Sequence, residues 1–267
     1  MSIARISGPG DPRIEAYRDV AAPDRLRARG LFVAEGRAVV RRLMDEAPDD
    51  VRSLLLSHAA LRDLEPALAA LGPGVPVYVC DAADFLGITG HDLHRGCLAL
   101  AARPEPRHVD ALLVSARMVI VLEGVTDADN VGGVFRNAAA FGADAVVLSP
   151  TCCDPLYRKA IRTSMAATLR VPFARAGEWP GALTRIRALG FTIIALTPRQ
   201  PSEDLDVFAS RPRPERLALL IGTEGAGLTP EAEAAADDRV RVPIRAGVDS
   251  LNLAVATGIA LYRLARR

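Results

Sequence analysis

Residues 118–150 read MVIVLEGVTDADNVGGVFRNAAAFGADAVVLSP, and this stretch decides the fold. The run 118–125 is apolar and predicts a buried strand, as does the run 144–150. Between them, residues 129–142 have the composition of a helix that ends at a glycine. A strand, a helix and a second strand in this order form a βαβ unit, in which the two strands pair in parallel. We therefore expect an α/β fold built on a parallel sheet.

The rest of the C-terminal half continues the alternation of helix and strand. We expect a helix at 179–190, strands at 191–198 and 217–225, and a closing helix from Leu251 onward. In open parallel sheets, ligands bind beyond the carboxyl ends of the strands. The sequence therefore predicts a ligand site formed by the strand ends, which are residues 123–125, 149–150, 197–198 and 222–225.

The N-terminal part of the chain, residues 1–102, predicts a smaller α/β unit. Its expected elements are helices at 34–43 and 61–71 and strands at 51–57, 75–80 and 97–102. The next stretch, 103–114, opens with two prolines among charged residues and is the expected linker. Residues 115–267 then form the second domain.

The composition indicates a globular protein that functions in the cytoplasm. Half of the 267 residues are hydrophobic, yet no apolar run approaches the roughly 18 residues of a membrane-spanning helix. The first residues, MSIARISGPGDPR, lack the apolar core of a signal peptide. The net charge of only +1 excludes binding of nucleic acid through overall charge alone. Any phosphate contact must be local.

The cysteines and histidines do not suggest a metal site. Cys80, Cys97, Cys152 and Cys153 lack the paired CxxC spacing of a zinc site, so we expect reduced structural thiols and no metal. His91 and His94 are three residues apart without an evident third ligand, and we expect both on the surface.

Arginine supplies nearly all the positive charge, since Lys159 is the single lysine. Arginine forms bidentate contacts with phosphate better than lysine does. The stretch 23–42 holds six arginines, at positions 25, 27, 29, 37, 41 and 42, against two acidic residues. It predicts either a phosphate-binding surface or an ordinary solvated helix face.

The segment LLIGTEGAGL, residues 219–228, delivers a carboxylate between glycines at the end of an expected strand. Glycines allow positive φ and a close approach of the backbone to a ligand. The segment matches neither GxGxxG nor the Walker pattern, so a nicotinamide or ATP cofactor is disfavoured. It indicates either a ligand loop or a tight turn with Glu224 in water.

Two polar residues of the first βαβ unit are candidates for the site. Asn130 stands at the start of the expected helix, where capping alone would explain it. Arg136 lies in the helix among Val134, Phe135 and Ala138, so we expect it to be half-buried. A half-buried arginine needs a carboxylate or a phosphate as its partner.

The start of the last helix, GVDSLNLAVATG at residues 247–258, carries more polar residues than helix capping needs. One short polar side chain caps a helix, yet both Ser250 and Asn252 are present, with Asp249 beside them. We expect Asp249 or Ser250 to cap the helix and Asn252 to face either the substrate or Arg136. A Ser-His-Asp hydrolase is disfavoured because Ser250 lacks the GxSxG elbow.

Taken together, DADNVGGVFRNAAAFGA, LLIGTEGAGLTP and VPIRAGVDSLNLAVATGIALY resemble the three motifs of the SpoU-type RNA ribose methyltransferases of the SPOUT superfamily. The resemblance covers about 115–267, and the ordered triple is far more specific than any single motif. The N-terminal FVAEGRAVVRRLM and HRGCLAL resemble the ribosomal-protein-like RNA-binding domain that often precedes this catalytic domain.

The resemblance implies methyl transfer from S-adenosylmethionine to a ribose 2′-hydroxyl of RNA, by a homodimer with a C-terminal trefoil knot. It places the catalytic residues at Asn130, Arg136, Glu224, Ser250 and Asn252 and the cofactor-binding residues at Thr197, Gly222, Val242, Ile244 and Leu251. Where the family commonly has Ile-Pro-Met, this chain has Val242-Pro243-Ile244, which keeps an apolar wall.

Within this reading, Arg136 acts either as a base or, as we prefer, by holding the target phosphate and stabilising the incipient alkoxide. Arg37, Arg41 and Arg42 are the expected RNA-binding residues. Ribosomal RNA is favoured over transfer RNA by the separate N-terminal domain. The alternatives are a tRNA 2′-O-methyltransferase, an enzyme that methylates a base nitrogen, and a non-catalytic RNA-binding protein that keeps the fold.

Overall fold

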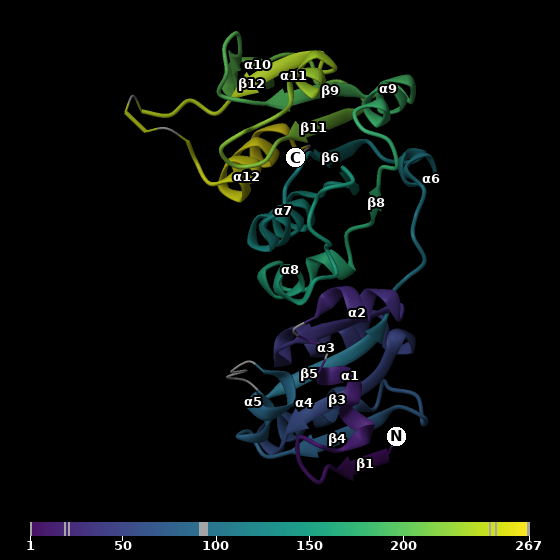
Figure 1. Cartoon of the computed structure of the whole chain (residues 1–267). Helices are drawn as coiled ribbons and strands as arrows, with labels where there is room; N and C mark the ends of the chain where they lie inside the picture. Colours follow the sequence, from purple (N-terminus) through teal and green to yellow (C-terminus); the bar gives the residue numbers. More distant parts are fainter. Residues whose placement is uncertain are drawn as a thin grey trace. The chain divides into compact units, whose positions relative to one another are not determined.

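The computed structural model describes residues 2–18, 20, 22–90, 96–245, 247–248 and 250–265. The chain divides into two compact units. The first contains Met1–Glu105 and Leu156–Leu169, and the second contains Pro106–Pro155 and Arg170–Arg267 (Figure 1). Over the described ranges, no helix has both the length and the apolar character needed to cross a bilayer.

The first unit is a mixed sheet with helices, and its strands lie in the order β1-β4-β3-β5-β2. Strand β4 is parallel to β1 and β3, whereas β5 is antiparallel to β3 and β2. The elements are β1 (Ser2–Arg5), the 3₁₀ turn Pro12–Ile14, α1 (Glu15–Arg18), α2 (Pro23–Ala28), β2 (Leu31–Glu35), α3 (Arg37–Glu46), the 3₁₀ turn Pro48–Asp50, β3 (Val51–Ser57), α4 (His58–Leu68), β4 (Pro76–Cys80), α5 (Asp84–Thr89), β5 (Cys97–Ala102), α8 (Arg158–Thr163) and the 3₁₀ turn Ala167–Leu169.

Helix α8 belongs to the first unit although it lies far along the chain from the rest of that unit. It packs against the edge strand β2. Glu35 at the end of β2 accepts from Arg158 at 2.8 Å and from Arg162 at 2.9 Å, and the Glu35 side chain is 12% exposed. A carboxylate this buried requires such partners. The expected assignment of residues 156–169 to the C-terminal domain therefore differs from the observed grouping.

The start of the expected helix at 34–43 is wrong. Ala34 lies in β2, which pairs with β5, and the helix α3 begins only at Arg37. Gly36 separates the two elements with φ of 97°, a backbone conformation that side-chain-bearing residues rarely adopt. The expected helix takes in the end of β2, whose apolar residues lie directly before α3.

The second unit is built on an entirely parallel sheet in the order β10-β12-β9-β11-β6-β7-β8, so the expected α/β fold with a parallel sheet is confirmed. Its elements are α6 (Val109–Leu113), β6 (Met118–Leu122), α7 (Ala128–Phe141), β7 (Ala145–Leu148), β8 (Phe173–Arg175), α9 (Gly181–Ala188), β9 (Thr192–Leu196), β10 (Glu203–Asp204), α10 (Leu205–Ala209), β11 (Leu217–Ile221), α11 (Pro230–Ala234), β12 (Asp238–Arg241) and α12 (Leu253–Leu264).

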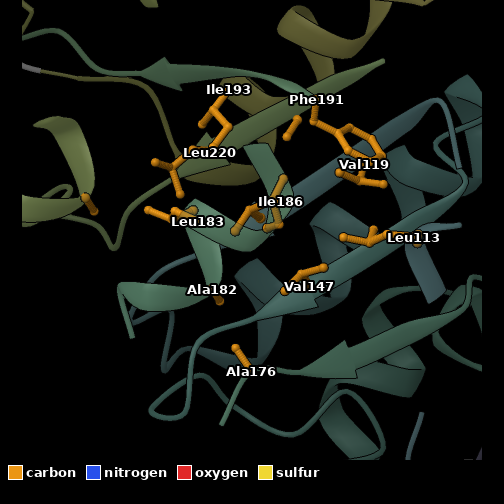
Figure 2. Close-up of a cluster of buried hydrophobic side chains, with 14 of the residues drawn as sticks. Leu113, Val119, Val147, Ala176, Ala182, Leu183, Ile186, Phe191, Ile193 and Leu220 are labelled. Atoms are coloured by element: carbon orange, nitrogen blue, oxygen red, sulfur yellow. The ribbon is translucent and has the colours of Figure 1, made fainter. Parts of the chain in front are cut away.

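Helices cover both faces of this sheet, which is why every residue of β6 and β11 is buried. On one face, α6 and α9 pack through Leu113 and Ile186 onto the strands (Figure 2). Ala232 of α11 belongs to the same cluster of buried residues. On the other face, α7 and α12 pack against each other (Figure 1). These layers bring the start of α12 to the start of α7.

The contact between α7 and α12 is close because a glycine lies in it. A Cβ added to Gly133 would lie 2.5 Å from the Cβ of Ala254, nearer than any real pair of such carbons. Asn137 also donates from Nδ2 to the carbonyl of Ala254 at 2.6 Å. The two helices are therefore held at a fixed spacing.

Several elements of the second unit differ from the sequence-based expectation. The short strands β8, β10 and β12 were not expected, and the linker stretch 103–114 contains the helix α6. The boundary between the units falls at Glu105–Pro106, inside that stretch. Strand β12, with the sequence DRVR, buries only Val240 and so lacks an apolar pattern.

All four cysteines are free thiols. Burial raises the pKa of Cys80 and of Cys97 to about 12, which keeps both thiols protonated at neutral pH. Within the described ranges, no group of three or more His, Cys, Asp and Glu residues is placed to hold a metal ion. His91 and His94 lie outside the described residues.

Candidate active site

Asn252 is the N-cap of α12, contrary to the expectation that Asp249 or Ser250 caps it. Its Oδ1 accepts from the amides of Ala254 at 3.0 Å and Val255 at 3.2 Å. A side-chain oxygen in this position satisfies amides that the first turn of a helix leaves unpaired. Because Oδ1 is held by the helix, Nδ2 points in a fixed direction away from it.

The Nδ2 of Asn252 joins the three sequence motifs. It donates to Oδ1 of Asn130 at 2.9 Å and to Oε1 of Glu224 at 3.0 Å. The same Glu224 oxygen accepts from the amide of Leu253 at 3.2 Å. Residues that are 28 and 122 positions away from Asn252 in the chain thus form one cluster, which we call the Asn130–Glu224–Asn252 cluster.

Asn130 is not the cap of α7. Asp127 fills that role, accepting from the amides of Asp129 at 2.7 Å and Asn130 at 3.0 Å. Asn130 is 5% exposed, on the first turn of the helix. Its Nδ2 has no hydrogen-bond partner within the described ranges. This buried amide is therefore free to donate to a ligand.

The loop that carries Glu224 makes a tight turn between β11 and α11. The amide of Gly227 donates to the carbonyl of Thr223 at 3.0 Å, and Gly225 and Gly227 have φ of 77° and 71°. A Cβ on Gly222 would lie 2.2 Å from the carbonyl carbon of Gly227. Glycine is therefore required at Gly222 by the close passage of the loop over its own start.

Arg136 is exposed, so the expectation of half-burial is wrong. Its neighbours Val134, Phe135 and Ala138 are buried, but adjacent helix positions are about 100° apart, which places Arg136 outside their face. Arg136 makes no hydrogen bond or ion pair with any described residue, and it does not join the Asn130–Glu224–Asn252 cluster. Its guanidinium is available to an external anion.

Ser250 is exposed and makes no hydrogen bond with the described part of the chain. It therefore neither caps α12 nor joins the cluster in this structure. Asp249 lies outside the described residues.

The expected cofactor positions lie at the carboxyl ends of parallel strands and in the segment before α12. Thr197 and Gly222 follow β9 and β11, which are neighbours in the sheet, and both residues are buried. Val242 follows β12, the strand on the other side of β9. Ile244 is 37% exposed and Leu251 is half-buried. The arrangement offers partly open apolar side chains beside main-chain groups.

Glu123 lies at the same sheet edge, and the sequence predicts it only as the end of a strand. Glu123, which follows β6, is 5% exposed and accepts from Trp179 Nε1 at 2.5 Å and from the hydroxyl and amide of Thr229, both at 2.8 Å. Thr229 in turn caps α11. Glu123 thereby fixes the end of the Glu224 loop, and its acidic side chain in an apolar strand was the available signal.

The expected RNA-binding arginines lie on α3 of the first unit, and each has a partner there. Arg37 forms an ion pair with Asp63, and Arg41 donates to the main-chain carbonyl of Asp63 at 2.7 Å. Arg42 donates to the carbonyl of Met165 at 2.7 Å. These contacts use part of each guanidinium, and Arg41 remains exposed.

Comparison with known proteins gives consistent matches over this chain. The model of the SpoU rRNA methylase family matches residues 117–262. An uncharacterized tRNA/rRNA methyltransferase of Mycobacterium tuberculosis is 40% identical over all of this chain and 93% of its own length. The 23S rRNA (guanosine(2553)-2′-O)-methyltransferase RlmP of Bacillus subtilis is 28% identical over 87% of this chain and 88% of its own length.

Among solved structures, the AdoMet-bound rRNA methyltransferase of Sinorhizobium meliloti has the same fold, with a TM-score of 0.82 over 98% of this chain and 97% of its own, at 24% identity. The fold and site define a SPOUT-type α/β protein. The chain belongs to the SpoU rRNA methylase family and is an RNA methyltransferase, which confirms the resemblance seen in the sequence.

Proposed function

We propose that this protein transfers a methyl group from S-adenosylmethionine to a ribose 2′-hydroxyl of RNA. The observation that carries the proposal is the Asn130–Glu224–Asn252 cluster, in which one asparagine amide hydrogen-bonds residues of both other motifs. The cluster lies at the carboxyl edge of a parallel sheet, where ligands of such folds bind. The Bacillus relative, named as a 2′-O-methyltransferase, supports the choice of ribose over base.

The residues at the strand ends suit S-adenosylmethionine by their chemistry. Val242, Ile244 and Leu251 offer apolar side chains to the adenine ring, and the backbone at Thr197 and Gly222 can hydrogen-bond its edge. S-adenosylmethionine supplies the activated methyl group that a ribose hydroxyl can accept. Since Glu224 is exposed, its carboxylate also contributes negative charge toward a cationic sulfonium.

The polar residues divide the remaining work between charge and orientation. Arg136, exposed and unpaired within the described ranges, holds the phosphate next to the target ribose and stabilises negative charge that develops on the 2′-oxygen. The free Nδ2 of Asn130 orients the ribose, and Asn252 and Glu224 fix Asn130 in place. Ser250, exposed at the same helix start, contributes a hydroxyl to the substrate.

The first unit is the part we propose to select the RNA, with ribosomal RNA as the favoured substrate. Arg37, Arg41 and Arg42 supply the phosphate contacts. The reaction takes place in the cytoplasm. Each phosphate contact releases counterions, so binding weakens with salt. Neutralising the three arginines should flatten that salt dependence, and an unchanged slope would show that they only stabilise the first unit.

The test of the proposal is methyl transfer itself. Binding of S-adenosylmethionine is measured by calorimetry, followed by transfer of a labelled methyl group to bulk RNA and mapping of 2′-O-methyl sites in RNA from a strain lacking the gene and from its parent. We expect one site to be lost in the deletion strain. Loss of a base methylation or of a tRNA site would overturn the ribose or the rRNA assignment, respectively.

We also propose a homodimer and a C-terminal segment threaded as a trefoil knot. The support for the dimer is a stripe of exposed apolar residues on one face of α12, namely Val255, Ile259 and Tyr262. The support for the knot is the path of the chain, which leaves β12 and returns past β9 and β11 to place α12 on α7.

A further inference from the structure

The ends of β9 and β11 are joined by the side chain of Arg199, which no sequence motif includes. Arg199 lies two residues beyond Thr197, and its Nη1 donates to the carbonyl of Leu228 at 2.9 Å. Its Nη2 donates to the carbonyl of Ala226. One guanidinium therefore holds two carbonyls of the loop that begins at Gly222 and carries Glu224.

A buried carboxylate keeps Arg199 in this position. Glu233 on α11 is 7% exposed, and its Oε1 lies 3.5 Å from Nη1 of Arg199. The same oxygen accepts from the hydroxyl of Thr197 at 3.0 Å, and that hydroxyl accepts from the amide of Arg199 at 3.2 Å. A buried carboxylate with two donors holds its position, because the loss of either donor leaves the buried charge less well compensated.

We infer that Arg199, anchored by Glu233, is a positioning residue that fixes the Glu224 loop against the end of β9, so that both the cofactor positions and the cluster keep their places. Thr197 and Gly222 are the two proposed cofactor positions that this bridge connects. Glu224, in the same loop, holds Asn252 and the amide of Leu253. The inference rests on the proposed function for the identity of the ligand.

Backbone geometry explains why the loop needs such a bridge. Within the loop, the amide of Ala226 donates to the carbonyl of Glu224 at 3.0 Å, and Gly225 and Gly227 have positive φ. Glycine-rich backbone has more conformational freedom to lose than other backbone. The hydrogen bonds of Arg199 to Ala226 and Leu228 oppose that freedom.

The experiment compares Arg199→Ala with Arg187→Ala, a matched control in the full chain. Arg187 is exposed to the same degree, 46% against 47%, and bonds one carboxylate, of Asp237, and one carbonyl, of Ala235, whereas Arg199 bonds one carboxylate and two carbonyls. It does not contact the Glu224 loop. Two measurements are made: amide hydrogen exchange over residues 222–228 and calorimetric binding of S-adenosylmethionine.

We expect exchange over residues 222–228 to accelerate in Arg199→Ala and not in Arg187→Ala. The dissociation constant of S-adenosylmethionine should rise about tenfold in Arg199→Ala, the effect of losing one to two hydrogen bonds. Arg199→Lys, which keeps the charge but not the fork of two donors, should restore less than half of the lost affinity on a logarithmic scale.

Equal exchange in the two alanine variants, or equal affinity, would overturn the inference. Full recovery by Arg199→Lys would show that charge and not the bridge matters, and would also overturn it. If the wild-type protein did not bind S-adenosylmethionine, the proposed function would fail, and the exchange comparison alone would still decide whether Arg199 holds the loop.

Discussion

At the residue scale, the site combines one orienting cluster with one unattached cation. Asn252 uses both ends of its amide, one for the amides of α12 and one for Asn130 and Glu224. Arg136 stands apart from this cluster and is exposed. In the proposed function, orientation and charge stabilisation therefore depend on different side chains, and the loss of each should have a different effect.

Replacing Arg136 should strongly lower activity without destabilising the fold. We expect Arg136→Ala to lower methyl transfer by at least about 100-fold, because the positive charge that stabilises the developing oxyanion is lost. Since Arg136 has no partner in the described chain, the free energy of unfolding of the Arg136→Ala protein should differ from that of the wild type by no more than about 0.5 kcal/mol. Turnover and thermal denaturation are measured side by side. Near-normal turnover would remove Arg136 from the mechanism.

Replacing Asn252 should destabilise the protein, whereas replacing Ser250 should not. Asn252→Ala removes a helix cap and should cost about 1 kcal/mol, measured by urea denaturation. Ser250→Ala is the control at the same helix start and should leave the stability unchanged, because Ser250 is exposed and unbonded in the described part of the chain. If Ser250→Ala kept its stability but lost methyl transfer, the Ser250 hydroxyl would be shown to contact the substrate. A larger stability loss in Ser250→Ala would contradict the observed cap.

At the element scale, the site depends on α7 and α12 starting side by side. Gly133 lets the helices approach, and Asn137 fixes their register through the carbonyl of Ala254. This spacing sets the distance between Asn130, three residues before Gly133, and Asn252, two residues before Ala254. A change at the helix contact should therefore reach the cluster without touching it.

We expect Gly133→Ala to push the two helices apart and to cost about 1–3 kcal/mol, as overpacking of a close contact does. The measurement is the free energy of unfolding. Gly177→Ala is the control, because a Cβ at Gly177 meets nothing within 4 Å. Equal stability of the two variants would mean that the helices can separate freely.

The exposed stripe on α12 should hold two copies of the chain together. Ile259→Glu places a charge in the stripe and should convert a dimer, with twice the chain mass of 28.4 kDa, into monomers. Sedimentation equilibrium reports the mass. Val114→Glu is the control at an exposed apolar residue outside α12. A wild-type monomer would contradict the proposed dimer.

In the second unit, the strands that the sequence predicts are those buried on both faces. The buried residues of β6, β9 and β11 are all apolar because helices cover each side of the sheet. Strand β12 was missed, since its charged residues Arg239 and Arg241 hide the single buried Val240. Burial on one side of a short strand leaves too little pattern to detect.

The candidate site was predictable as a set of residues but not as a set of contacts. The order of the three motifs identified Asn130, Glu224 and Asn252, whereas the choice of Asn252 as cap depends on where α12 begins. Arg136 was misplaced because the burial of sequence neighbours was carried over to it. Arg199 and Glu233 were invisible, since their pairing depends on the return of the chain to the same sheet edge.

At the scale of the whole molecule, the first unit is completed by a segment from the middle of the chain. Residues 156–169 supply α8, whose arginines pair with Glu35 and whose apolar side chains Ala160 and Ile161 are fully buried. The chain therefore passes between the units at three points, after Glu105, Pro155 and Leu169. The first unit is not a continuous sequence.

A fragment of residues 1–105 should be less stable than the same fragment carrying residues 156–169 on a flexible glycine-serine linker. Without that segment, Glu35 loses both arginines and the edge strand β2 loses its helix. Thermal denaturation followed by circular dichroism compares the two fragments. Identical midpoints would show that α8 adds nothing to the first unit.

The three passages of the chain between the units also limit how this protein can have diversified. A single genetic crossover near position 105 would give a chimaera whose α8 comes from one parent and whose Glu35 comes from the other. The N-terminal unit can be exchanged between lineages only when the 156–169 segment travels with it or already matches. Because we propose that the first unit selects the RNA, changes in RNA choice should then appear as paired substitutions in these two distant parts of the gene.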